Sequence, residues 1–291
     1  MHATKTLFLV GALAAASGAR AEVALLARPP VYADAKNVML KSPEGVGCSA
    51  TALVVADTGN ARLVSYGWKD GVLEGGTEIR VPQLAAPVRV QLDPSGAMFV
   101  LDRKAKKIAK LSPAGAFQGW AELKEPGIVP GAFRVDGAGA LYVLDVAGGA
   151  ILVADTSGTV TRRLPVPKGA LVTDLAVDPS GTIYALDARG AAVWSADKAA
   201  TELKQLSRTL HDEMSFPAYL TTDGKIIYVV DQNGNGLVLL GPDGVYLGRR
   251  LAIGWGDGLV YYPSQLCLGS GGEVALADRG NNRVQLFTVT R

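Results

Sequence analysis

The sequence predicts an all-β fold, a six-bladed β-propeller whose ring is closed by the N-terminal strand of the mature chain. Three observations predict it. A short apolar run that ends in Asp occurs six times, the copies are almost evenly spaced, and the last copy lacks one strand that an apolar segment near the N-terminus could supply. Hydrophobic residues make up 48% of the chain, which is enough for a sizeable core and argues against intrinsic disorder.

The repeated run is typical of a buried strand. The copies occupy residues 53–57, 98–102, 141–145, 183–187, 227–231 and 274–278. Successive terminal Asp residues lie 42 to 47 positions apart. Each run holds four apolar residues, many of them β-branched or aromatic, between turn-forming residues, which favours a strand over a helix. One further strand is expected before each run and two after it, so a unit of about 45 residues corresponds to a four-stranded propeller blade.

The two ends of the chain are expected to meet in one blade. The sixth unit supplies three strands and then stops at Arg291. An apolar segment at residues 23–26 precedes the first unit and would complete the sixth blade. Closing the ring removes exposed sheet edges, which otherwise invite aggregation. We therefore expect residues 22–291 to form one six-bladed domain.

Residues 1–21 have the pattern of a secretory signal peptide. Lys5 precedes an apolar stretch at residues 7–16, and residues 19–21 form a small-x-small cleavage site. The stretch is shorter than the roughly 20 residues of a membrane-spanning helix, so no membrane insertion is expected, with a retained N-terminal anchor as the alternative. The protein is therefore expected to be exported, to the periplasm or the extracellular medium.

The charge balance argues against a nucleic-acid partner. The net charge is +2, and loss of residues 1–21 would remove two basic residues and no acidic one. A neutral mature chain lacks the positive field with which general nucleic-acid and anionic-membrane binders attract their targets.

Two of the units resemble NHL repeats. In residues 56–64 and 277–287 the strand and its Asp are followed by a Gly-Asn turn, and Arg62 or Arg283 then opens the next strand. The other units depart from this pattern. Gly236, Ala150 and Ala192 stand at the basic position of the fifth, third and fourth units, and the second unit has Lys107 but a different turn. The resemblance implies a six-bladed propeller with a binding role more often than an enzymatic one.

The function expected from these features is that of an exported, non-catalytic propeller that binds a protein or another extracytoplasmic ligand. We expect a monomer without a cofactor or catalytic residues. The alternative is a calcium-dependent hydrolase resembling six-bladed lactonases, and a third possibility is a structural component of an envelope assembly.

Residues with possible metal or acid–base chemistry have a simpler explanation. The repeated Asp residues suit Asx-turns, in which the carboxylate accepts backbone N–H groups, better than a ring of cation ligands. Residues 231–236 match the start of a calcium loop, but Pro242 stands at the twelfth position, where such a loop needs Glu. His2 belongs to the expected signal peptide, which leaves His211 alone and excludes a zinc site with several His ligands.

The two cysteines are candidates for a disulfide bond. Cys48 and Cys267 fall on the innermost strands of the first and sixth blades, with the same side-chain parity. These blades become neighbours only if the ring closes, and an exported protein permits pairing. The alternative is two buried free thiols.

A partner surface is expected where the links between blades share a face with the turns between second and third strands. Long links that carry aromatic and Arg side chains resemble interface hot spots. The surface is expected to span blades five, six, one and two. Its residues are Arg62, Lys104, Lys107, Trp255, Tyr261, Tyr262 and Arg283. The alternative is that the two arginines bridge neighbouring blades through the repeated Asp residues and that the aromatic residues pack between blades.

Overall fold

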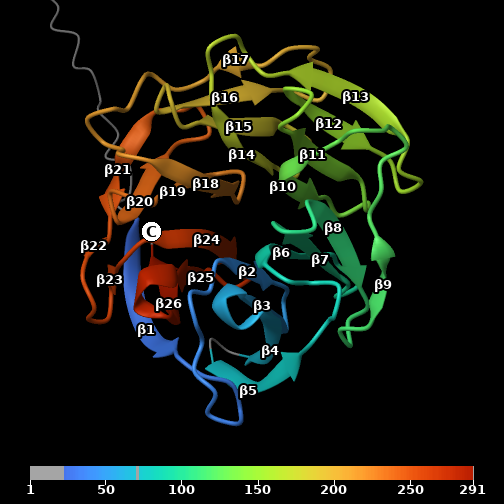
Figure 1. The fold of residues 1–291 in the computed structure, drawn as a ribbon. Helices are drawn as coiled ribbons and strands as arrows, with labels where there is room; N and C mark the ends of the chain where they lie inside the picture. The colour runs from blue at the N-terminus through green and yellow to red at the C-terminus, as the bar shows by residue number, and fades with distance from the viewer. Residues whose placement is uncertain (1–22, 70–71, 291) are drawn as a thin grey trace, which may run out of the picture.

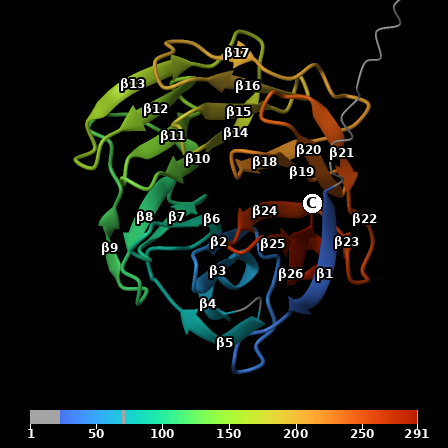
Figure 2. The same ribbon diagram turned by 180° about the vertical axis from the view of Figure 1, so that it is seen from behind.

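The fold is a ring of six antiparallel sheets around a central axis (Figure 1). The structure is a computed structural model that describes residues 23–69 and 72–290. In blades one to five the chain passes from the innermost strand to the outermost, and Figure 2 shows the same ring from behind. The six four-stranded blades and the all-β class are those that the sequence predicts. The expected signal peptide lies outside the described residues.

The strands of the first three blades follow the repeat spacing. Blade one contains β2 (Gly45–Cys48), β3 (Ala52–Asp57), β4 (Arg62–Lys69) and β5 (Val72–Ile79). Blade two contains β6 (Pro87–Leu92), β7 (Met98–Asp102), β8 (Lys107–Leu111) and β9 (Phe117–Trp120). Blade three contains β10 (Pro130–Val135), β11 (Leu141–Asp145), β12 (Ala150–Ala154) and β13 (Val160–Pro165).

The other blades keep the same order up to the closing strand. Blade four contains β14 (Val172–Val177), β15 (Ile183–Asp187), β16 (Ala192–Ala196) and β17 (Lys204–Gln205). Blade five contains β18 (Pro217–Thr222), β19 (Ile227–Asp231), β20 (Gly236–Leu240) and β21 (Tyr246–Arg250). Blade six contains β24 (Pro263–Leu268), β25 (Glu273–Asp278), β26 (Arg283–Thr290) and β1 (Ala24–Val31).

The N-terminal strand closes the ring as expected. β1 pairs antiparallel with β26, in a register that runs from Ala24 opposite Thr290 to Val31 opposite Val284. The sheet order β1-β26-β25-β24 makes β1 the outermost strand of blade six. A disulfide bond joins Cys48 of β2 to Cys267 of β24, with a Cα–Cα distance of 5.7 Å. The ring is therefore closed by strand pairing of the two chain ends within blade six and by a covalent bond between blades six and one near the axis.

The core lies between neighbouring blades. The second strand of each blade is buried on both faces, so its apolar run contacts the blades on either side. Val55 of blade one, for example, shares a buried cluster with Ala275 of blade six. Full burial of one such side chain stabilises by roughly 1.5–3 kcal/mol, which explains why the repeat keeps this run in all six units.

Two short segments form 3-10 helices rather than strands or turns. The 3-10 helices η1 (Thr58–Asn60) and η2 (Arg279–Asn281) follow β3 and β25, where the sequence carries the Gly-Asn pattern. Each ends at a residue in the left-handed region, Ala61 with φ 50° and Asn282 with φ 55°. Among the described residues, no helix is long and apolar enough to span a membrane.

Candidate functional site

The link face of the propeller is defined here as the face that carries the links between blades and the turns between second and third strands. The opposite face carries the remaining turns. On the link face, the aspartates that end the second strands are buried. Each carboxylate accepts a hydrogen bond from a backbone N–H group of the link that leads into its own blade: Asp57 from Lys41, Asp102 from Ala86, Asp145 from Val129, Asp187 from Leu171, Asp231 from Phe216 and Asp278 from Tyr261. The repeated Asp therefore holds the links in place, in agreement with its structural interpretation.

Arg62 is buried rather than presented to solvent. Its side chain is 1% exposed, and Nε donates to Asp57 at 2.7 Å while Nη1 donates to Asp34 at 2.6 Å. Nη2 donates to the carbonyl oxygen of Val38. Burial alone would lower the pKa of Arg62, but hydrogen bonds to Asp57 and Asp34 outweigh it and raise the pKa. The expectation that Arg62 belongs to an exposed surface is therefore wrong. The two buried carboxylates of Asp57 and Asp34 hold its guanidinium group beneath the link that contains Asp34 and Val38.

Arg283 is buried in the equivalent position of blade six. Its side chain is 1% exposed, and Nε pairs with Asp278 at 2.8 Å. Nη2 donates to the carbonyl oxygens of Gly256 and Leu259, each at 2.8 Å, and Nη1 donates to the Tyr32 hydroxyl at 3.0 Å. This residue also has to be removed from the expected surface. Each arginine pairs with the repeated Asp of its own blade and holds the link that leads into that blade. The alternative, that the arginines bridge neighbouring blades through the repeated Asp residues, is therefore also not what the structure has.

The Gly-Asn pattern serves the same purpose. Asn281 donates through Nδ2 to the carbonyl oxygen of Gly254 at 2.8 Å. Gly280 donates through its N–H to the carbonyl oxygen of Tyr261 at 2.8 Å, and a Cβ atom at Gly280 would overlap the Tyr261 ring. Glycine is therefore required here for the close approach of the link. The motif residues point inward and hold the loop that lies above them.

That loop carries an exposed aromatic cluster. Between β21 and β24 the chain makes an excursion with two short parallel strands, β22 (Ala252–Ile253) and β23 (Leu259–Val260), which belong to none of the six blades. Trp255 lies between them and is 75% exposed. The Trp255 and Tyr261 ring centroids are 6.2 Å apart, and those of Tyr261 and Tyr262 are 4.7 Å apart in an edge-to-face arrangement.

We name these residues the Trp255 patch: Ile253, Trp255, Leu259, Tyr261 and Tyr262. All are exposed except Tyr261, which is half-buried between the two other aromatic rings. The structure thus brings together the three aromatic residues expected from the sequence. Tyr32, exposed and bound to Arg283, lies beside the same loop and was missed, because its segment lies outside the repeat and carries no pattern.

The patch is also supported from blade five. The Tyr262 backbone N–H donates to Asn235 Oδ1 at 2.8 Å, and Asn235 is buried. Asp231 accepts backbone N–H groups and pairs with Arg249 at 2.8 Å. The segment that matches the start of a calcium loop therefore uses its oxygen atoms to hold links. In residues 23–69 and 72–290, no group of three or more His, Cys, Asp and Glu side chains is arranged to hold a metal ion.

Lys104 and Lys107 lie apart from the Trp255 patch. Both are exposed: Lys104 lies in the turn between β7 and β8 and Lys107 is the first residue of β8, on the opposite side of the ring from β22 and β23 (Figure 1). Lys107 lines a separate pocket between blades two and three. One continuous surface over blades five, six, one and two is therefore wrong, because the two arginines that would connect it are buried.

Side chains of the innermost strands meet across the central axis. Arg89 of blade two and Arg134 of blade three each lie 4.7 Å from the ring centre of Tyr219 in blade five. Arg89 donates to the carbonyl oxygen of Ala218, and Arg134 pairs with buried Asp174 of blade four at 3.0 Å. These contacts tie four blades together. Arg89, Arg134 and Tyr219 lie outside the repeated apolar runs, so periodicity alone offers no signal for them.

Toward the opposite face, the axis opens into a cavity of about 230 Å³ whose wall includes the Cys48–Cys267 disulfide. Its polar lining includes Gln91 and Gln265. The Gln265 side chain accepts from the N–H groups of Val46 and Val90, so it bridges the innermost strands of blades one and two. The disulfide therefore belongs to the wall of the central cavity and lies away from the Trp255 patch.

Comparison with known proteins agrees with this geometry. Residues 260–287, which run from the Trp255 patch through Arg283, match the model of the NHL repeat. The chain is a six-bladed β-propeller that carries an NHL repeat. A search of the curated proteins found no sequence match to it.

Solved structures share the fold at low identity. A streptogramin B lyase superposes with a TM-score of 0.67 at 13% identity, over 92% of this chain and 98% of the lyase. A gluconolactonase from Xanthomonas campestris has a TM-score of 0.64 at 14% identity, over 94% and 99% of the two chains. A chain of a nidogen–laminin complex has a TM-score of 0.59 at 18% identity, over 78% and 92%. These similarities establish the propeller fold alone, which hosts both enzymes and binding proteins.

Proposed function

We propose that this propeller is an exported, non-catalytic binding protein whose Trp255 patch docks a protein partner in the cell envelope or outside the cell. The observation that carries the proposal is that the Trp255 side chain is 75% exposed, while the backbone carbonyl groups of both neighbouring residues accept hydrogen bonds from buried or partly buried side chains. The carbonyl oxygen of Gly254 is bound by Asn281 and that of Gly256 by Arg283. Trp and Tyr are enriched among the residues that dominate binding energy at protein interfaces.

The rigidity of the loop supports binding rather than incidental exposure. Association costs free energy for every loop that must be ordered, so a loop already ordered in the free protein retains more of its contact energy as affinity. Arg283 and Asn281 order the Trp255 loop from below, at buried positions. An exposed cluster of apolar residues on such a support is typical of an interaction site.

Export is supported by two independent features. Residues 1–21 have the pattern of a signal peptide, and the Cys48–Cys267 disulfide is of the kind that persists in oxidising compartments. A protein partner in the periplasm or the extracellular medium fits both features. Neither a nucleic acid nor an anionic membrane is proposed, since the mature chain would be neutral.

Partner capture tests the proposal. The full protein and a Trp255→Ala/Tyr262→Ala variant are used as bait in extract of the native cell envelope. Val245→Ser serves as the control, because Val245 is 49% exposed on the opposite face. We expect a partner that the wild type and the control retain and the double variant loses. The same captured proteins with all three baits, or none with any, would overturn the proposal.

A further inference from the structure

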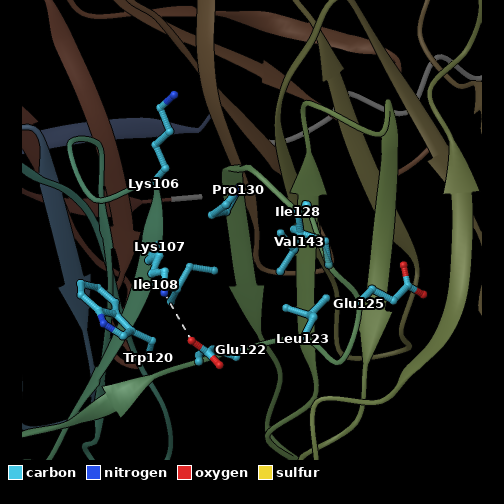
Figure 3. A pocket seen from close by; sticks show the side chains of 12 residues that line it. Lys106, Lys107, Ile108, Trp120, Glu122, Leu123, Glu125, Ile128, Pro130 and Val143 are labelled. Carbon is cyan, nitrogen blue, oxygen red and sulfur yellow. Dashed lines mark hydrogen bonds and ion pairs between the residues drawn. The ribbon is translucent and has the colours of Figure 1, made fainter.

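A pocket of about 270 Å³ opens between blades two and three on the link face (Figure 3). Part of its wall is apolar. Ile108 of β8, Leu123 and Ile128 of the link between the blades, and Val143 of β11 lie around its interior, with Pro130 beside them. This volume lies just below the roughly 300–1,000 Å³ that small-molecule sites usually enclose. The pocket is therefore suited to a small apolar or aromatic body.

A weak ion pair stands at the rim. Lys107 Nζ lies 3.4 Å from a carboxylate oxygen of Glu122, and the two side chains are 51% and 69% exposed. An exposed pair of this kind contributes little to stability, so Lys107 can turn to another anion at small cost. The Trp120 ring, half-buried in the wall, lies with its centre 5.7 Å from Lys107 Nζ.

Basic side chains outweigh acidic ones at the rim of the pocket. Lys106, which also lines the pocket, is exposed, and among the described residues it has no carboxylate within ion-pair distance. Glu125, the second acidic residue at the pocket, is paired with Arg163 of blade three. Lys106 and Lys107 therefore line the pocket with Glu122 as the acidic residue not held by Arg163, and a cationic ligand would meet more repulsion than attraction.

We propose that this pocket binds a small amphipathic anion, with an apolar or aromatic body between Ile108, Leu123 and Val143 and a carboxylate at Lys107. The ligand is a free small molecule, because the pocket encloses only about 270 Å³. The site lies on the opposite side of the ring from β22 and β23 (Figure 1). It is a second site, independent of the partner surface proposed above.

Titration of the full protein with octanoate tests the site, with binding followed by calorimetry. We expect saturable binding at one site. Lys107→Ala should weaken the affinity at least about fivefold, because a charge-assisted contact is lost. Leu123→Trp should abolish binding by filling the pocket. Lys110→Ala is the matched control, since Lys110 lies on the same strand but faces the Phe99 ring outside the pocket, and it should bind like the wild type.

Head-group variation and charge reversal complete the test. Octylammonium should bind at least about fivefold more weakly than octanoate, because the rim is positive. Lys107→Glu changes an exposed residue and leaves the apolar part of the wall intact. It should lose octanoate binding, and it tests the site even if Leu123→Trp fails to fold. The proposal is overturned if octanoate does not bind, if octylammonium binds equally well, or if binding survives in Lys107→Glu.

Discussion

The guanidinium group of Arg283 donates a hydrogen bond of 2.8 Å to the carbonyl oxygen of Gly256, the residue that follows Trp255. Arg283 is 1% exposed and Trp255 is 75% exposed. A buried motif residue thus fixes the backbone beside the most exposed aromatic side chain of the link face. The residues of the NHL-like motif are therefore buried and support the fold, and the Trp255 patch lies over them at the surface.

Arg283→Ala should lower the free energy of unfolding by about 3–5 kcal/mol, because it leaves the buried carboxylate of Asp278 without its cation. Denaturant unfolding measures the loss. Arg80→Ala is the control, since Arg80 is 65% exposed and pairs with Glu78 at the surface, where a pair contributes no more than about 1 kcal/mol. Equal losses in the two variants would contradict the structural role given to Arg283.

The buried ion pair of Asp34 predicts how stability depends on pH. Burial alone would raise the pKa of Asp34, but hydrogen bonds from the Val38 N–H group and Arg62 outweigh it, and the pKa is lowered. The contribution of Asp34 to stability is therefore present above the unfolded-state pKa of about 3.9 and is lost as pH falls through the lower folded-state value.

Unfolding measured between pH 6 and pH 2 checks this expectation. The wild type should lose stability with a steeper slope below about pH 4 than Asp34→Asn, which has no proton to take up at this position. A slope that is the same in both proteins would show that Asp34 does not contribute to acid unfolding.

The disulfide should be a large part of the stability of the closed ring. Cys48 and Cys267 are 219 residues apart, and cross-linking so long a loop stabilises by roughly 5 kcal/mol in the chain-entropy model. The Cys48→Ser/Cys267→Ser variant should therefore unfold at lower denaturant concentration. Thiol titration of the unfolded, unreduced protein should find no free thiol, whereas two free thiols would exclude the bond.

Calcium should leave the melting temperature unchanged. A ligand that binds only the native state raises that temperature. In the segment that matches a calcium loop, Asp231 is already engaged by Arg249 and by backbone N–H groups, and Asn235 is engaged by Tyr262. Thermal melts after chelator treatment, with and without added calcium, test this. A rise of several degrees would instead favour the calcium-dependent hydrolase.

The repeat explains why the fold could be predicted and much of the site could not. The apolar runs and their spacing predict the blades because each buried strand must be apolar on both faces. Arg62 and Arg283 were misplaced because a basic residue after a turn resembles a surface residue, and only the structure shows Asp57 and Asp278 turning it inward.

Residues outside the repeat carry no periodic signal. Tyr32 reaches Arg283 from a loop before the first unit, and Arg89 meets Tyr219 across the central axis. The pocket at Lys107 is formed by a link and by strands of two blades, so its walls come together only in the folded ring. Such sites depend on contacts between distant segments, which a single sequence does not reveal.

We propose that the Trp255 patch binds the partner and contributes little to the stability of the fold. The most direct measurement compares the partner affinity and the melting temperature of the wild type with those of Trp255→Ala and Tyr262→Ala. We expect each substitution to weaken binding by about 2 kcal/mol or more, as for interface hot spots, with little change in melting temperature. Lower melting temperatures with unchanged affinity would show instead that the aromatic residues are part of the packing and do not bind the partner.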